Sequence, residues 1–144
     1  MKQKGFTLIE TMITVAVIAV LATLAAPSFV NTINQTNARK SSDFVAQMIN
    51  YAKSEALNKN KDVYLSISNT AICLSSTALV TIGHTCDIRT DALQAGATVT
   101  NSLSEIKFDK VYGLPPPSNP VITVKYKDIL KTITLNILGI ITVS

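Results

Sequence analysis

The feature that most limits how this chain can fold is an uninterrupted apolar run near its start, from residue 6 to residue 26. Glu10 is the only ionisable residue within this run. At about 1.5 Å of rise per residue, a helix of this length measures about 31 Å, which matches the hydrocarbon core of a bilayer. The run therefore predicts a membrane-spanning helix.

Two basic residues, Lys2 and Lys4, precede the run without a nearby acid. The positive-inside rule then places the N-terminus in the cytoplasm and everything after Pro27 on the other side of the membrane. The remaining residues are enough for one modest domain. We expect one membrane segment and one extracytoplasmic domain.

A cleaved signal peptide is the alternative interpretation, with small residues such as Thr23 and Ala25 near the cut. It would leave a secreted or anchored domain of another function. The apolar run, however, exceeds the roughly 7 to 15 residues of a signal-peptide core. A charge at the bilayer centre costs about 2.5 to 3.5 kcal/mol, and less near the end of a span, where Glu10 lies. Glu10 therefore needs a partner, and the run contains no basic residue.

The stretch "KGFTLIE", residues 4–10, with an apolar helix and a proline after it, resembles the class III leader of type IV pilins and type II secretion pseudopilins. The resemblance implies that a prepilin peptidase cleaves between Gly5 and Phe6 and that Phe6 is then N-methylated. The new α-amine, with a reference pKa of about 7.7 to 8.0, is largely cationic at neutral pH. In such filaments the glutamate neutralises this amine, within its own chain or on a neighbour, and this role falls to Glu10.

Helical periodicity continues after Pro27. One face is predicted to carry Val30, Ile33, Asn37, Phe44, Val45, Met48, Ile49, Ala52 and Ala56, with Arg39, Lys40, Asp43, Gln47, Lys53 and Lys59 elsewhere. We expect one helix over residues 6–61, with a kink at Pro27 because proline lacks an N–H group. The alternative is that Pro27 merely separates two ordinary helices.

Residues 62–144 change from helical spacing to alternation, which is typical of strands. The predicted strands cover residues 63–67, 71–74, 79–82, 98–101, 105–108, 121–126, 130–137 and 140–143, with tight turns at 127–128 and 138–139. Four prolines in residues 113–120 predict a loop. The expected fold is α+β and type IV pilin-like, with a long N-terminal helix packed on a small antiparallel β-sheet domain.

The two cysteines, Cys73 and Cys86, lie in the extracytoplasmic part, where disulfides persist, and we expect them to be bonded. A zinc site that adds His84 and Asp87 is the alternative, although no paired CxxC spacing is present. The sequence contains no GxSxG, HExxH, P-loop or GxGxxG motif. We therefore expect no enzymatic activity, metal or cofactor.

A narrower resemblance covers residues 38–68, the cysteine pair, "IKFDKVYG" and the short terminal strands, which together look like the GspH/FimT family of minor pilins and pseudopilins. It implies a low-abundance subunit of a type IV pilus that acts in assembly or initiation, or a GspH-type pseudopilin of a type II secretion system. Its partners would be other subunits, the prepilin peptidase and an inner-membrane assembly platform. The subunit would cross the inner membrane once, with a periplasmic domain, before it enters a filament.

DNA uptake is a further role that the resemblance to this family implies, and two features of the sequence argue against it. FimT-type uptake proteins resemble each other in a C-terminal glycine-arginine motif, but here Ile140 and Thr142 follow Gly139. Residues 62–144 contain six basic and six acidic side chains. A patch of Lys125, Lys127 and Lys131 would give salt-dependent DNA binding. Alternatively, these lysines form a solvated face of an edge hairpin and discourage aggregation.

Overall fold

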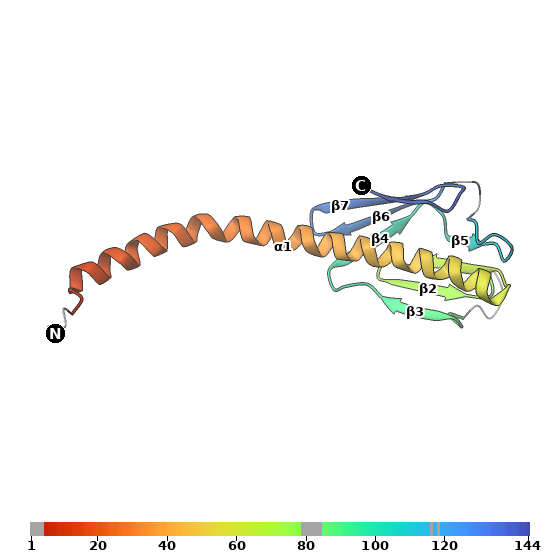
Figure 1. Cartoon of the computed structure of the whole chain (residues 1–144), viewed down its shortest axis with the longest axis horizontal. Coiled ribbons are helices and arrows are strands. Elements are labelled where there is room, and N and C mark those ends of the chain that lie inside the picture. Colours follow the sequence, from red (N-terminus) through yellow and green to blue (C-terminus); the bar gives the residue numbers. More distant parts are fainter. Residues whose placement is uncertain (1–4, 79–84, 116, 118) are drawn as a thin grey trace. The chain divides into compact units, whose positions relative to one another are not determined.

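The computed structural model describes residues 5–78, 85–115, 117 and 119–144 (Figure 1). Within these ranges the chain forms one helix and eight strands. It divides into two compact units, Met1–Gln35 and Thr36–Ser144. We call the second unit the head.

Helix α1, Leu8–Lys59, is a single element, as predicted, and begins and ends within two residues of the predicted bounds. Its C-terminal end has the hydrogen bonds of a Schellman motif. The N–H of Lys61 donates to the carbonyl of Ala56 (3.2 Å), and the N–H of Asn60 donates to the carbonyl of Leu57 (3.4 Å). Asn60 has a φ of 50°, in the left-handed region that asparagine tolerates better than most residues. The chain can therefore reverse direction into the first strand.

The head contains two antiparallel four-stranded sheets. Sheet A has the order β3-β2-β1-β5 and consists of β1 (Val63–Ile67), β2 (Ala71–Ser75), β3 (Arg89–Ala92) and β5 (Glu105–Phe108). Sheet B has the order β4-β6-β7-β8 and consists of β4 (Ala97–Asn101), β6 (Val121–Tyr126), β7 (Ile129–Leu135) and β8 (Ile141–Val143). The two sheets meet where the N–H of Val99 donates to the carbonyl of Asn69 (3.0 Å).

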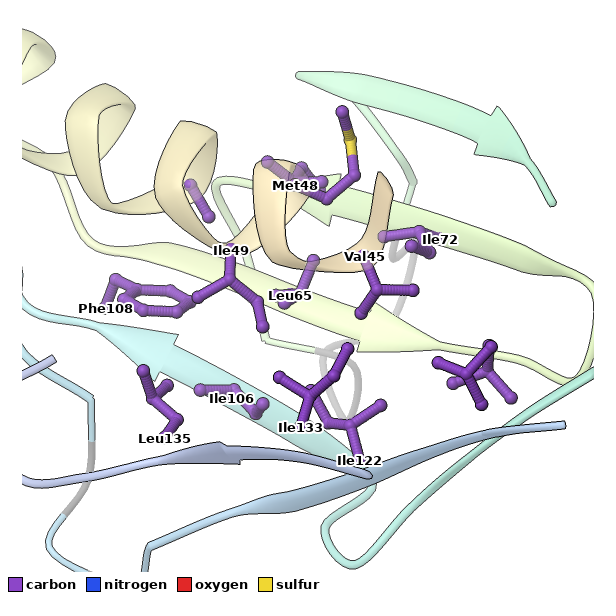
Figure 2. Packing of buried hydrophobic residues seen from close by; sticks show 14 of the residues in the cluster. Val45, Met48, Ile49, Leu65, Ile72, Ile106, Phe108, Ile122, Ile133 and Leu135 are labelled. Atoms are coloured by element: carbon purple, nitrogen blue, oxygen red, sulfur yellow. The ribbon is translucent and has the colours of Figure 1, made fainter. Parts of the chain in front are cut away.

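A single core joins both sheets to the second half of α1. Figure 2 shows the labelled side chains of α1, sheet A and sheet B, all but Met48, directed into a common interior. Its members from α1 are Val45, Met48, Ile49, Ala52 and Ala56. On the strands other than β3 and β8, buried residues alternate with more exposed ones, as the period of a strand with one covered face requires. All of these core residues belong to the head.

The predicted apolar face of α1 is buried only within the head. Val30 and Ile33 are exposed. Three polar residues of α1 that the periodicity did not place on this face, Ser41, Ser42 and Glu55, are buried. The hydroxyl of Ser41 has no hydrogen-bond partner among the described residues. Ser42 Oγ donates to the carbonyl of Arg39 (2.8 Å), and Glu55 forms an ion pair with Lys59. These local partners offset the cost of burying polar groups.

The strand predictions differ from the structure mainly at β3 and β7, and one predicted strand is not tested. Strand β3 was not predicted, because its sequence, RTDA, has no apolar alternation; it forms by pairing with β2. The strand predicted at residues 79–82 lies outside the described residues. Strand β7 ends at Leu135, two residues early, because Asn136 Oδ1 accepts hydrogen bonds from the N–H groups of Leu138 (3.0 Å) and Ile140 (2.8 Å) and forms a turn.

Candidate functional site

The predicted cleavage site lies just outside the start of α1. Residues 5–7 are not helical, and both Gly5 and Phe6 are exposed, Phe6 to 80%. No described atom lies within 4 Å of the position that a Cβ of Gly5 would occupy. Exposed segments outside regular structure are where peptidases can bind a backbone. The bond between Gly5 and Phe6 is therefore accessible in this structure.

The helix begins immediately after this bond because Thr7 caps it. The N–H groups of Glu10 and Thr11 donate to the carbonyl of Thr7 (3.1 and 3.3 Å), and the Glu10 N–H also lies 3.4 Å from Thr7 Oγ1. A threonine followed three residues later by a glutamate has the spacing of a capping box. The pattern is present in the sequence and would have predicted this cap. It places the cleavage site before the helix and Glu10 in its first turn.

Glu10 is located where a helix favours a negative charge. The first turn carries a partial positive charge from its unpaired N–H groups, so a carboxylate is stabilised there. The side chain is exposed, and none of the ion pairs among the described residues includes it. The carboxylate of Glu10 is therefore available to form an ion pair with a cation of its own chain or of a neighbouring chain.

The first part of α1 has an apolar surface on all sides. Its exposed large side chains include Leu8, Ile9, Met12, Ile13, Val15, Val17, Ile18, Val20 and Leu21. The hydroxyls of Thr11, Thr14 and Thr23 each donate to a carbonyl three residues earlier, at 2.7 to 2.9 Å. These polar groups therefore need no external partner in lipid. Among the described residues, α1 is the one helix long and apolar enough to cross a membrane.

The predicted disulfide is present in the head. Cys73 of β2 is bonded to Cys86, with their Cα atoms 5.3 Å apart. The ends of the closed loop are also joined by Asp87, whose carboxylate accepts hydrogen bonds from the N–H (2.9 Å) and Oγ (2.6 Å) of Ser76. A loop of this length contributes about 3 kcal/mol in the chain-entropy description.

The zinc alternative does not fit this bonding, because disulfide sulfurs cannot bind a metal as thiolates. The third ligand of that alternative, His84, lies outside the described residues. Among the side chains that are described, no group of three or more His, Cys, Asp and Glu residues could hold a metal ion.

The three lysines of the predicted patch do not share one face of sheet B. Lys125 lies opposite Leu130, whereas Lys131 lies opposite Val124, which is buried in the core. Directly paired residues of antiparallel strands point to the same side, so Lys125 and Lys131 point to opposite sides. Lys127 is in the turn between β6 and β7, with a φ of 52°. The hairpin therefore offers no continuous basic surface.

Several other cations of the head are neutralised locally. Lys107 Nζ lies 2.8 Å from Asp62 Oδ2, Lys59 Nζ lies 2.6 Å from Glu55 Oε1, and Arg89 pairs with Asp91. The hydrogen bond from Lys107, together with that from the N–H of Lys110 (3.1 Å), lowers the pKa of Asp62 below its usual 3.8. The same bond raises the pKa of Lys107. Asp62 thus ties the start of β1 to β5 and to the loop that follows β5.

We expect Asp62→Asn to lower the thermal stability of the head at neutral pH. Because the pKa of Asp62 is lower in the folded head than its usual 3.8, its carboxylate stabilises the fold above that value. This stabilisation is lost as the pH falls through the folded-state pKa of Asp62. The melting temperatures of the unchanged head and of Asp62→Asn should therefore converge in acid. The measurement is a series of melting curves of residues 36–144, from neutral pH down to below the folded-state pKa of Asp62. Asp128→Asn, which removes an exposed carboxylate in a turn, is the control. A difference that persists unchanged in acid would contradict the prediction.

Comparisons with known proteins agree with this arrangement. Residues 1–26 match the family described as the prokaryotic N-terminal methylation motif. The fold matches two crystal structures of the type IV minor pilin FimU from Pseudomonas aeruginosa. In the first, the TM-score is 0.64 at 15% identity, over 76% of this chain and 90% of that chain; in the second, it is 0.61 at 14% identity, over 74% and 91%. No curated protein sequence matches the chain.

Proposed function

We propose that this chain, which combines a type IV minor pilin-like fold with a prokaryotic N-terminal methylation motif, is a minor pilin subunit of a type IV pilus and takes part in pilus assembly and initiation. One observation carries the proposal: an exposed, non-helical Gly5–Phe6 bond stands directly before a capped helix whose apolar run, residues 6–26, contains a single carboxylate, that of Glu10. This arrangement provides a site for processing, a membrane anchor and a charge that only processing can neutralise.

In this proposal the prepilin peptidase cuts after Gly5 and methylates Phe6. The new α-amine then lies near the positive end of the α1 dipole, where a cation is disfavoured unless an anion is close. Glu10 supplies that anion, either to its own chain or to an adjacent subunit. The apolar side chains of residues 6–23 are covered by lipid before assembly and by neighbouring helices after it.

The proposed location follows from the same features. The chain crosses the inner membrane once through residues 6–26, with its N-terminus in the cytoplasm and the head in the periplasm, until an assembly platform transfers it into a filament of pilin subunits. A proline kink at Pro27 would mark the exit from the membrane. A GspH-type pseudopilin of a type II secretion system is the alternative. We prefer the pilus because the matched solved structures are type IV minor pilins.

DNA uptake is not part of the proposal. It would need a basic surface, and Lys125 and Lys131 point to opposite sides of sheet B. Lys107 and Arg89 have carboxylate partners. At the C-terminal positions where FimT-type uptake proteins carry arginines, Ile140 and Thr142 offer no charge for phosphate.

The test is intact mass and N-terminal sequencing of the chain from membranes and from sheared filaments, with the prepilin peptidase present or deleted. We expect a mature chain that begins at methylated Phe6, only when the peptidase is present, and that is recovered in the filament fraction. A chain that begins near Ala26, or one that keeps Met1 in both strains, would overturn the proposal. Recovery only when a type II secretion platform is present would favour the pseudopilin.

A further inference from the structure

Strand β8 leaves one edge of sheet B open. The backbones of Thr132 and Ser144 exchange two hydrogen bonds (3.0 and 2.9 Å). From this pair onward, the facing residues of β7 and β8 alternate between pairs that are hydrogen-bonded to each other and pairs that are not. Thr142 therefore bonds to β7, whereas the N–H and C=O groups of Ile141 and Val143 point away from the sheet. Neither of these outward N–H groups donates to any residue in the described part of the chain.

The other three sheet edges are protected. Strand β3 carries the ion pair of Arg89 and Asp91, and β5 carries Glu105 and Lys107. Charged side chains on an edge discourage the addition of another strand. Strand β4 has no charge, but two of its three outward N–H groups, those of Ala97 and Val99, donate to the carbonyls of Gln94 (2.9 Å) and Asn69 (3.0 Å). Among the described edges, β8 alone has neither protection.

The segment that contains β8 is apolar, although the amine of Lys53 on α1 lies beside Gly139, in the turn before this strand. Residues 132–144 contain no charged side chain. Several large apolar side chains in or beside β8 are exposed: Ile137, Leu138, Ile140 and Val143. The side chain of Val143 lies on the core side of sheet B, opposite Ile133, yet is 41% exposed. A strand added beside β8 would cover it.

We propose that the β8 edge accepts an extended, uncharged strand from the head of a different, neighbouring subunit of the same filament. This inference rests on the proposed function. The edge is three residues long and offers two outward donors and two outward acceptors, which is too little to hold a separate partner. A subunit already held nearby by its membrane or filament helix has a high effective concentration, so that a small edge is sufficient. Backbone bonds give the affinity, and the missing charges select an uncharged strand.

The test uses the full chain in its own bacterium, with a photo-crosslinking amino acid in place of Thr142, whose exposed side chain lies on β8. The matched control carries the same group in place of Thr90, an exposed threonine on the protected edge strand β3. Into the first chain we introduce Val143→Pro, which removes an outward N–H but none of the bonds to β7. Val143→Thr keeps both the shape and the N–H and is its control.

We expect position 142, but not position 90, to crosslink to a different subunit that itself has a processed, methylated N-terminus. Val143→Pro should lower the yield about tenfold, since one backbone bond is lost and its acceptor is left unpaired, while Val143→Thr should leave it unchanged. Equal yields in the two variants, equal yields at positions 142 and 90, or crosslinking only to a second copy of this chain would overturn the inference.

The N-terminus of the chain is sequenced in the same samples, which separates the two proposals. If the chain begins at methylated Phe6 but the crosslink is absent or insensitive to Val143→Pro, the inference fails and the proposed function stands. If the chain is not processed between Gly5 and Phe6, the proposed function fails and the inference fails with it.

Discussion

Replacing Glu10 with glutamine should remove the chain from filaments almost completely while it is still processed. The substitution keeps the size of the side chain and its place in the first turn of α1. In the proposed assembly, however, glutamine cannot neutralise the amine of Phe6. If neighbouring helices cover this helix start in the proposed filament, an amine left without its anion costs about 3 to 5 kcal/mol, as in comparable buried ion pairs. The amount of this chain in sheared filaments should therefore fall about tenfold or more, measured against its amount in membranes.

The control is Glu10→Asp, which keeps the charge on a shorter side chain and should retain more of the incorporation than glutamine does. Both variants should begin at methylated Phe6 by intact mass, which shows that the peptidase step is unaffected. Normal incorporation of Glu10→Gln would mean that the carboxylate has another role and that the amine finds its partner elsewhere.

Phe108→Ala should destabilise the head by about 3 to 5 kcal/mol, the usual cost of truncating a fully buried phenylalanine. Phe108 is 0% exposed at the end of β5 and lies in the common core, opposite Val63 of β1. Figure 2 shows its ring beside Ile49 of α1. The loss would leave a cavity where α1 and sheet A meet.

The measurement is denaturant unfolding of residues 36–144, which contain every residue of the core, followed by circular dichroism. Tyr112→Ala is the matched control, since this aromatic residue lies four positions later and is 71% exposed. We expect the control to change the free energy of unfolding by less than about 0.5 kcal/mol. A similar loss in both variants would indicate that the ring of Phe108 does not fill the core as described.

Much of the fold could be predicted because the two periods of the sequence are distinct. The helical spacing from Val45 to Ala56 and the alternation in β1 each place apolar residues on one face, and the structure buries those residues. The division into two sheets was not predictable in this way. Alternation identifies the covered face of a strand but not its neighbour, which depends on partners far along the chain. Strand β3 was missed for the same reason, because its pairing with β2 outweighs a sequence of low strand propensity.

The candidate site was only partly accessible to sequence reasoning. The leader pattern indicated Gly5, Phe6 and Glu10 directly, because these residues act through local chain order. The lysine patch was predicted from the spacing of the lysines along the chain. The register of β6 and β7 instead places Lys125 and Lys131 on opposite sides of sheet B. The open edge at β8 could not be anticipated, since it depends on which backbone groups remain after both sheets have formed.

The threonine hydroxyls of α1 have a consequence for the transfer of a subunit out of lipid. The hydroxyls of Thr11, Thr14 and Thr23 each donate a hydrogen bond to a carbonyl of the same helix. These hydrogen bonds can therefore be kept both in a bilayer and when the helix is packed against other helices. The apolar side chains around them also find a similar medium in both places. Between the two environments, therefore, the main electrostatic difference for residues 6–26 is the state of Glu10 and the amine. In the proposed assembly, the transfer of a subunit from lipid to the filament therefore depends chiefly on whether the carboxylate of Glu10 and the amine neutralise each other.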